Sequence, residues 1–298
     1  MKTFDYIKNI IKVIAWPILL GIGQFFIILI FSYSFNNNIY NNLVKENNTL
    51  TPDQINEMFS IYSKTDEYKN SLTNYINENT IWIVLIVALI FIPLLIFAYK
   101  KYQPNFNFKL NKNILYVILN ALIISIIYNL FIININKMLN INNNLVQSKY
   151  LLQIIISTGL IGPIIEELLF RGVVFNKVKS FNNIKSSILI TTFIFAFFHD
   201  SISQMIYAFI VGYICINLYI KNKTLLVPII FHIIGNIIVP IINNYLINLS
   251  YLYSFIIIIL LIPILIILYK KMYKTNWFVQ YNNVNIKLFT PLESNFIN

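Results

Sequence analysis

Long apolar runs separated by short polar segments make up most of the chain. A membrane-spanning helix needs about 20 predominantly apolar residues, and eight runs approach or exceed that length. They lie at about 10–35, 81–99, 114–133, 150–170, 186–199, 202–220, 225–247 and 252–269. The pattern predicts an all-α integral membrane protein with about eight transmembrane helices.

The fourth and seventh runs contain glycines and prolines, which favour irregular helix. These residues are Gly159, Gly162 and Pro163 in the fourth run, and Pro228, Gly235 and Pro240 in the seventh. Irregular helix at membrane depth is tolerated where it is packed in protein or lines a wet cavity. We therefore expect interruptions in these two helices, close to any internal cavity.

The composition agrees with a membrane protein: 58% of the residues are hydrophobic, 11% are charged and the mean hydropathy is +0.69. Soluble domains carry about 25% charged residues. The formal net charge of +11 could suggest nucleic-acid binding. The lysines, however, sit at the ends of apolar runs rather than in one basic patch, which argues against nucleic acid as a partner.

The positions of Lys and Arg predict the orientation of the chain. With the N-terminus in the cytoplasm, 17 of the 22 Lys and Arg residues fall on the cytoplasmic side. This bias predicts a multi-pass protein of the plasma membrane with both termini cytoplasmic. The run at 10–35 is too long for a signal-peptide core and lacks a small-residue cleavage site, so we expect it to remain as a helix.

The longest polar segment, about 36–80, is expected to be an extracytoplasmic loop. Within it, Thr51 and Gln54 have the spacing of a capping box, which predicts a helix start. Ile55, Met58, Phe59 and Tyr62 then form one apolar stripe at helical spacing. This short helix could rest on the bilayer surface or act as a lid or docking helix.

Few ionisable side chains lie inside the apolar runs, and these are the candidates for chemistry. Glu166 and Glu167 are adjacent in the fourth run, and the chain has only two histidines, His199 and His232. An ionisable group at membrane depth is costly and is a functional hypothesis by default. Glu167 and Arg171 are spaced i, i+4, which favours an ion pair and leaves Glu166 available.

Counting residues from the nearest lysines places the polar groups of three helices at a similar depth. Glu166, His199 and Asn236 each lie 13 or 14 residues from a lysine at the expected boundary, or roughly 20 Å at 1.5 Å per residue. His232 and Asn236 share a helix face. The groups therefore converge on one level, either as a reactive centre or as a structural polar plug.

These groups suit the attack of water on a carbonyl. A carboxylate in a low-dielectric site can act as a general base, and His and Asn can donate to a developing oxyanion. Two histidines and a carboxylate could also bind zinc. There is no serine nucleophile elbow or His-Glu-x-x-His motif, and Cys215 is the only cysteine, so we expect no metal or other cofactor.

Three motifs in order resemble those of the CPBP family. They are Glu166-Glu167-x-x-x-Arg171, Phe195-x-x-x-His199 and His232-x-x-x-Asn236. That family comprises CAAX prenyl proteases of the Ras-converting type and bacteriocin-processing or immunity (Abi) proteins. The resemblance covers about 150–245 and implies a CPBP-type helical bundle with glutamic intramembrane endopeptidase activity.

The resemblance also implies a role for each motif residue. Glu166 would be the general base, His199 would support the water, and His232 with Asn236 would form the oxyanion hole. Glu167 and Arg171 would be the supporting ion pair. The implied substrate is a membrane-associated protein or peptide.

We expect three regions along the chain. N-terminal transmembrane helices occupy 1–149, the protease-like core 150–247, and the last transmembrane helix with a polar cytoplasmic tail 248–298.

Two other functions are considered beside the peptidase. One rival is a non-enzymatic immunity or partner-binding membrane protein of the same family. The other is a transporter that relays protons through the buried Glu and His residues.

Overall fold

The computed structural model describes residues 3–47, 49–103, 113–139, 150–246 and 248–273, and every regular element among them is a helix. The predicted all-α fold class is confirmed. In chain order the helices are α1 (Thr3–Glu46), α2 (Pro52–Tyr62), α3 (Asp66–Lys100), α4 (Ile114–Met138), α5 (Leu151–Ile154), η2 (Ile155–Ile161), α6 (Gly162–Glu167), η3 (Leu168–Val174), α7 (Phe175–Lys179), α8 (Ile184–Phe197), α9 (Ile202–Asn222), α10 (Leu226–Leu246) and α11 (Tyr251–Tyr273).

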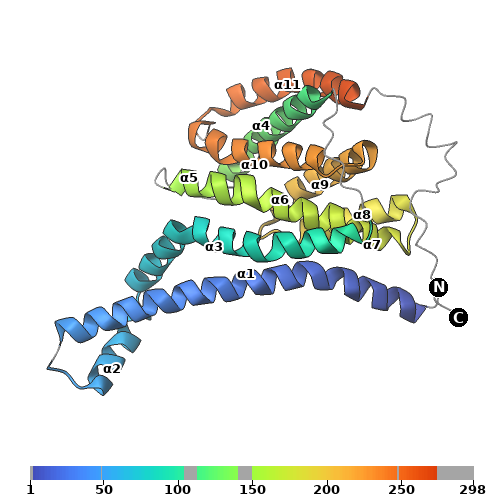
Figure 1. Cartoon of the computed structure of the whole chain (residues 1–298). Helices are drawn as coiled ribbons and strands as arrows, with labels where there is room; N and C mark the ends of the chain where they lie inside the picture. Colours follow the sequence, from blue (N-terminus) through green and yellow to red (C-terminus); the bar gives the residue numbers. More distant parts are fainter. Residues whose placement is uncertain (1–2, 48, 104–112, 140–149, 247, 274–298) are drawn as a thin grey trace, which may run out of the picture.

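The helices pack in layers (Figure 1). The continuous helix Leu151–Lys179, formed by α5, η2, α6, η3 and α7 and called the central helix below, lies at the middle of the bundle. From one side to the other, α1 packs on α3, α3 on the α5–α7 helix, that helix on α10, α10 on α4, and α4 on α11. α8 and α9 pack against each other, and α9 also contacts α10. The helix that carries both candidate glutamates is therefore enclosed by α3 and α10.

All eight predicted runs lie in helices, but the structure does not confirm a count of eight spans. Among the described residues, six helices are long and apolar enough to cross a membrane. The apolar helix α8, Ile184–Phe197, is shorter than this, whereas α10 has 21 residues, of which Leu226–Ile242 form its apolar stretch. With 14 residues, α8 is about 21 Å long, whereas a bilayer core is about 30 Å thick.

The predicted interruptions take a milder form than expected. The fourth run is one continuous helix, Leu151–Lys179, in which two seven-residue π-helices, η2 and η3, flank the short α-helix α6. A π turn contains extra residues without ending the helix. α10 continues through Pro240 as an α-helix, so no break at that proline is observed.

Most of the segment 36–80 is helical, and its extracytoplasmic location stays a prediction. α1 continues to Glu46 and α3 begins at Asp66. The extensions are held together by aromatic side chains: the Phe35 ring lies 5.2 Å from the Tyr75 ring and 5.8 Å from the Tyr68 ring. These contacts between distant segments stabilise helices whose Asn-rich sequences have weak intrinsic helix propensity.

The predicted helix start at Thr51 is confirmed. The backbone N–H of Gln54 donates to Thr51 Oγ1 at 3.4 Å, and the Thr51 N–H donates to Gln54 Oε1 at 2.9 Å, forming a capping box before α2. Ile55 is buried, and the Phe59 ring lies 6.1 Å from the Tyr40 ring of α1. Of the apolar stripe of α2, only Ile55 is buried, Phe59 and Tyr62 are partly buried, and Met58 is exposed.

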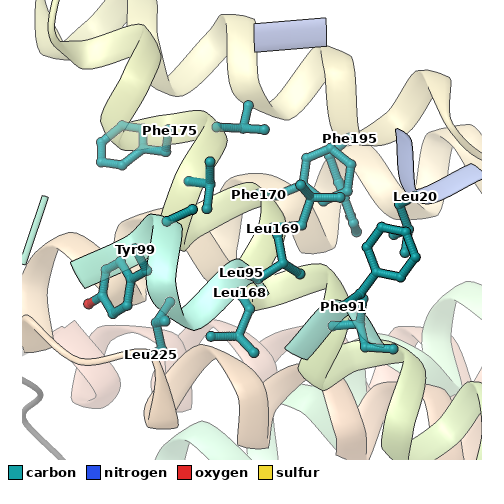
Figure 2. Close-up of a cluster of buried hydrophobic side chains, with 14 of the residues drawn as sticks. Leu20, Phe91, Leu95, Tyr99, Leu168, Leu169, Phe170, Phe175, Phe195 and Leu225 are labelled. Carbon is teal, nitrogen blue, oxygen red and sulfur yellow. The ribbon is translucent and has the colours of Figure 1, made fainter. Parts of the chain in front are cut away.

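A buried apolar cluster fixes the central helix against its neighbours (Figure 2). Leu95 of α3, Leu169 and Phe170 of η3 and Phe195 of α8 are each no more than 4% exposed. Fully burying a Leu or Phe side chain contributes about 1.5–3 kcal/mol. This packing holds the helix that carries the carboxylates in a defined position beside the polar cluster.

Candidate active site

The two glutamates end the α-helical segment between the two π-helices. α6 begins at Gly162, and Pro163 lies in its first turn. A Cβ atom at residue 162 would lie 3.2 Å from the carbonyl oxygen of Ser157, so a side chain there would crowd the π-helical backbone. π-helical turns inside α-helices are often found at functional sites.

Glu167 and Arg171 form a fully buried ion pair. Arg171 Nη1 donates to Glu167 Oε1 at 2.8 Å, and the side chains are 1% and 0% exposed. Arg171 Nη2 also donates to the carbonyl oxygen of Gly212 at 3.0 Å, and the guanidinium lies 4.5 Å from the centre of the Phe195 ring. Hydrogen bonds and a cation–π contact thus compensate the burial of the Arg171 charge.

His232 joins the two glutamates. Its Nδ1 lies 2.9 Å from Glu167 Oε1, the oxygen that also accepts from Arg171. Because that carboxylate oxygen is an acceptor, the Nδ1 atom carries the proton of this hydrogen bond. The other ring nitrogen, Nε2, then points to Glu166, whose Oε2 atom lies 3.7 Å away.

Glu166 is the less engaged of the two carboxylates. Its side chain is 31% exposed, whereas that of Glu167 is 0% exposed. Oε2 of Glu166 is itself buried and has no hydrogen-bond partner among the described residues. An unsatisfied buried carboxylate oxygen beside an imidazole is costly unless another group or a water molecule pairs with it.

His199 lies in the turn after α8. Its ring packs against the Phe195 ring, which His232 also contacts. The Nδ1 atom of His199 is 2.9 Å from the carbonyl oxygen of Phe195. The Phe195 ring makes edge-to-face contacts with His199, at 5.0 Å between ring centres, and with His232, at 5.8 Å. The structure therefore brings both histidines to Phe195, and only His232 is in hydrogen-bond contact with a glutamate.

Asn236 lies one turn beyond His232 on α10. Its Nδ2 donates to the carbonyl oxygen of Thr158 in η2 at 3.1 Å. α10 therefore contacts the central helix through two polar groups: His232 at the glutamates and Asn236 at the π-helical backbone. One of the two N–H groups of the Asn236 amide is used in this contact, and the other remains for a ligand.

Several groups at this site could not be predicted by searching the sequence for catalytic or ligand-binding side chains. The Thr158 and Gly212 carbonyls are backbone acceptors, so no side-chain motif indicates them. Tyr207 and Ser125 lie behind Gly235, with their hydroxyl oxygens 2.8 Å apart. A Cβ at residue 235 would lie 2.9 Å from the Tyr207 hydroxyl, and the lone glycine in α10 was the only sequence signal of this close approach.

No group of three or more His, Cys, Asp or Glu side chains is placed to hold a metal ion in the part of the chain that the structure describes. Cys215 is fully buried and its thiol lies 3.7 Å from the carbonyl oxygen of Pro228. The polar centre is therefore made of two carboxylates, a guanidinium, two imidazoles and an amide.

Fold and site together define a class: an all-helical, multi-pass membrane protein with a carboxylate–histidine centre enclosed by its helices. Residues 148–238 match the family model of type II CAAX prenyl endopeptidase Rce1-like proteins. Over these residues, less than a third of the chain, the sequence is similar to that endopeptidase family.

One curated relative is "Putative membrane peptidase YdiL" of Bacillus subtilis (strain 168), to which the chain is 32% identical over 97 residues. The alignment covers 31% of this chain and 40% of the relative, so the chain spans less than half the length of that relative. No solved structure matches the chain significantly.

Proposed function

We propose that this protein is a glutamic intramembrane endopeptidase that hydrolyses a peptide bond of a membrane-associated protein or peptide. The observation that carries the proposal is the difference between the two glutamates. Glu167 is fully buried and its Oε1 pairs with Arg171 and His232, whereas Glu166 is 31% exposed and its Oε2 lies 3.7 Å from His232 Nε2 without a hydrogen-bond partner among the described residues. A separation of this size matches two atoms that share one bridging water at about 2.8 Å from each.

In the proposed reaction, Glu166 removes a proton from that water while its oxygen attacks the scissile carbonyl. The bond between water oxygen and carbonyl carbon forms, and the carbonyl electron pair moves to its oxygen. The electron pair of the oxyanion then re-forms the carbonyl, the carbon–nitrogen bond breaks, and Glu166 gives the proton to the leaving nitrogen. His199, at the open end of α8, supports the water.

His232 and Asn236 are proposed to stabilise the oxyanion. Glu167 fixes the His232 ring by accepting from Nδ1, so an N–H at Nε2 can be directed at the substrate.

The localisation is part of the proposal. The excess of Lys and Arg on one side supports a plasma-membrane protein with both termini in the cytoplasm. The six long apolar helices support the multi-pass arrangement. The substrate would then reach the centre from within or beside the bilayer.

The decisive experiment compares membrane proteomes of cells that produce wild-type protein, Glu166→Gln or Asp200→Asn at equal levels. Asp200 is exposed and lies next to His199 in sequence, so its variant is a matched control. New peptide termini should be present with the wild type and Asp200→Asn and absent with Glu166→Gln. Identical termini with wild type and Glu166→Gln would contradict the peptidase and favour the non-enzymatic alternative.

A further inference from the structure

A second hollow in the molecule lies away from the glutamates, between α4, α9 and α11. It has a volume of about 460 Å³, and its lining residues, Lys270 included, face it with carbon atoms. Tyr128 and Phe131 of α4, Ile210 of α9 and Ile266 of α11 are among its lining residues. Phe131, Ile210 and Ile266 are 41–52% exposed, so the groove is open along the outer surface of the bundle.

One end of this groove is strongly basic. Lys270 of α11 lines the groove itself. Lys221 at the end of α9 donates to the backbone carbonyl of Met272 at 2.7 Å, which brings the ends of α9 and α11 together. Lys271 lies over the ring of Tyr116 in α4 at 5.7 Å. All three helices that form the groove therefore meet at this lysine-bearing end.

No carboxylate in these helices balances that charge. α4, α9, α10 and α11 contain no Asp or Glu. Lys270 and Lys271 are both exposed. An apolar groove that ends in lysines is complementary to a molecule with hydrocarbon at one end and negative charge at the other.

We propose that this groove binds one anionic phospholipid, with an acyl chain against α4, α9 and α11 and the phosphate at Lys270. An acyl chain is the hydrocarbon that a groove open to the bilayer can take up. Basic pockets between transmembrane helices on the cytoplasmic side bind anionic head groups. The site is independent of the proposed peptidase activity, since none of its lining residues belongs to the glutamate centre.

The test measures the thermal stability of the purified full-length protein in neutral detergent during lipid titration. Phosphatidylglycerol should raise the melting temperature saturably, because a ligand that binds the folded state stabilises it. Phosphatidylcholine with the same acyl chains should raise it much less. Equal stabilisation by both lipids would overturn the proposal.

Three variants sharpen the result. Lys270→Gln should abolish the difference between the two lipids, and Ile266→Trp, which fills the groove, should abolish saturable stabilisation. Lys100→Gln, at the end of α3 and outside the groove, should behave like the wild type. Equal losses in Lys270→Gln and Lys100→Gln would show a diffuse charge effect. Stabilisation by glycerol phosphate alone would assign the site to a soluble anion instead. Either result would refute a lipid groove.

Discussion

Glu167 and Glu166 are neighbours with opposite surroundings, and this contrast is the main chemical feature of the molecule. Glu167 is fully buried between Arg171 and His232. Glu166 retains a partly exposed side chain with one unpaired oxygen. One carboxylate is thus already held by a guanidinium and an imidazole, and the other is the residue that we propose as the general base.

Glu167→Gln should lower the amount of folded protein. The change removes the negative charge that compensates the buried Arg171, and breaking a buried pair in this way costs about 3–5 kcal/mol. The measurement is detergent-solubilised yield together with melting temperature. Glu166→Gln should leave both near wild-type values, and a Glu167→Gln protein as stable as the wild type would contradict the structural role.

Asn236→Ala should reduce turnover roughly 10²–10³-fold with little change in KM, as expected for loss of an oxyanion donor. His232→Ala should have a similar effect, and the double variant should lose less than the product of the two. The measurement is kcat and KM on one cleaved peptide. If Asn236→Ala raised only KM, Asn236 would be a docking residue.

Chelation should leave activity unchanged. His232 Nδ1 is engaged by Glu167, and the cluster offers no set of three protein ligands in the described residues. Activity after exhaustive chelation and elemental analysis of the purified protein test this. Loss of activity that Zn²⁺ alone restores would make Glu166, His199 and His232 metal ligands.

Sequence spacing could predict contacts within one helix but not those between helices. The i, i+4 spacing of Glu167 and Arg171 indicates their contact directly. The contact between His232 and Glu167 joins residues 65 positions apart and depends on how α10 packs against the central helix. Similarly, the depth estimate placed Asn236 near the glutamates, but its contact with the Thr158 carbonyl depends on the π-helical backbone of η2.

At the scale of the elements, the central helix and α10 carry almost all residues of the polar centre. Residues of α9 pack against both helices and affect how closely they approach each other. Gly212 of α9 offers its carbonyl to Arg171, and a Cβ there would lie 2.9 Å from the Phe195 ring. Tyr207 of the same helix contacts α10 at Gly235. Small residues thus allow close approach of three helices, as is common in membrane bundles.

Gly235→Ala should impair activity because its methyl group would displace the Tyr207 hydroxyl, 2.9 Å from the Cβ position. Tyr207→Phe removes that hydroxyl, so the double variant should recover part of the lost turnover. Ser125 keeps its hydrogen bond to the Ala121 carbonyl in both proteins. Turnover and folded yield of the two single variants and the double variant test this, and a double variant no more active than Gly235→Ala would refute it.

The elements that sequence reasoning missed are those stabilised from outside their own segment. The ends of α1 and α3 fall in the polar segment 36–80, in which the sequence predicted only the helix that starts after Thr51. Their helical structure depends on contacts such as Tyr68 with Asn36, at 2.6 Å between side-chain oxygens. By contrast, α2 carries its own start signal in Thr51 and Gln54 and could be predicted from sequence.

At the scale of the whole molecule, the bundle combines helices of very different length. α1 has 44 residues and α8 has 14. The long helices extend beyond any bilayer core, whereas α8 falls short of it. His199 follows directly on the end of this short helix.

With α8 in contact with lipid, the thickness of the surrounding bilayer would be a variable of the proposed reaction. A helix of about 21 Å in a core of about 30 Å requires the bilayer to thin locally or water to enter above its end. Either response brings water towards His199, and a thicker bilayer makes it more costly. In proteoliposomes of phosphatidylcholines with increasing chain length, turnover per folded protein should therefore fall, while the same protein in detergent should show no such trend. Constant turnover across all chain lengths would show that α8 is shielded from the lipid by its neighbours.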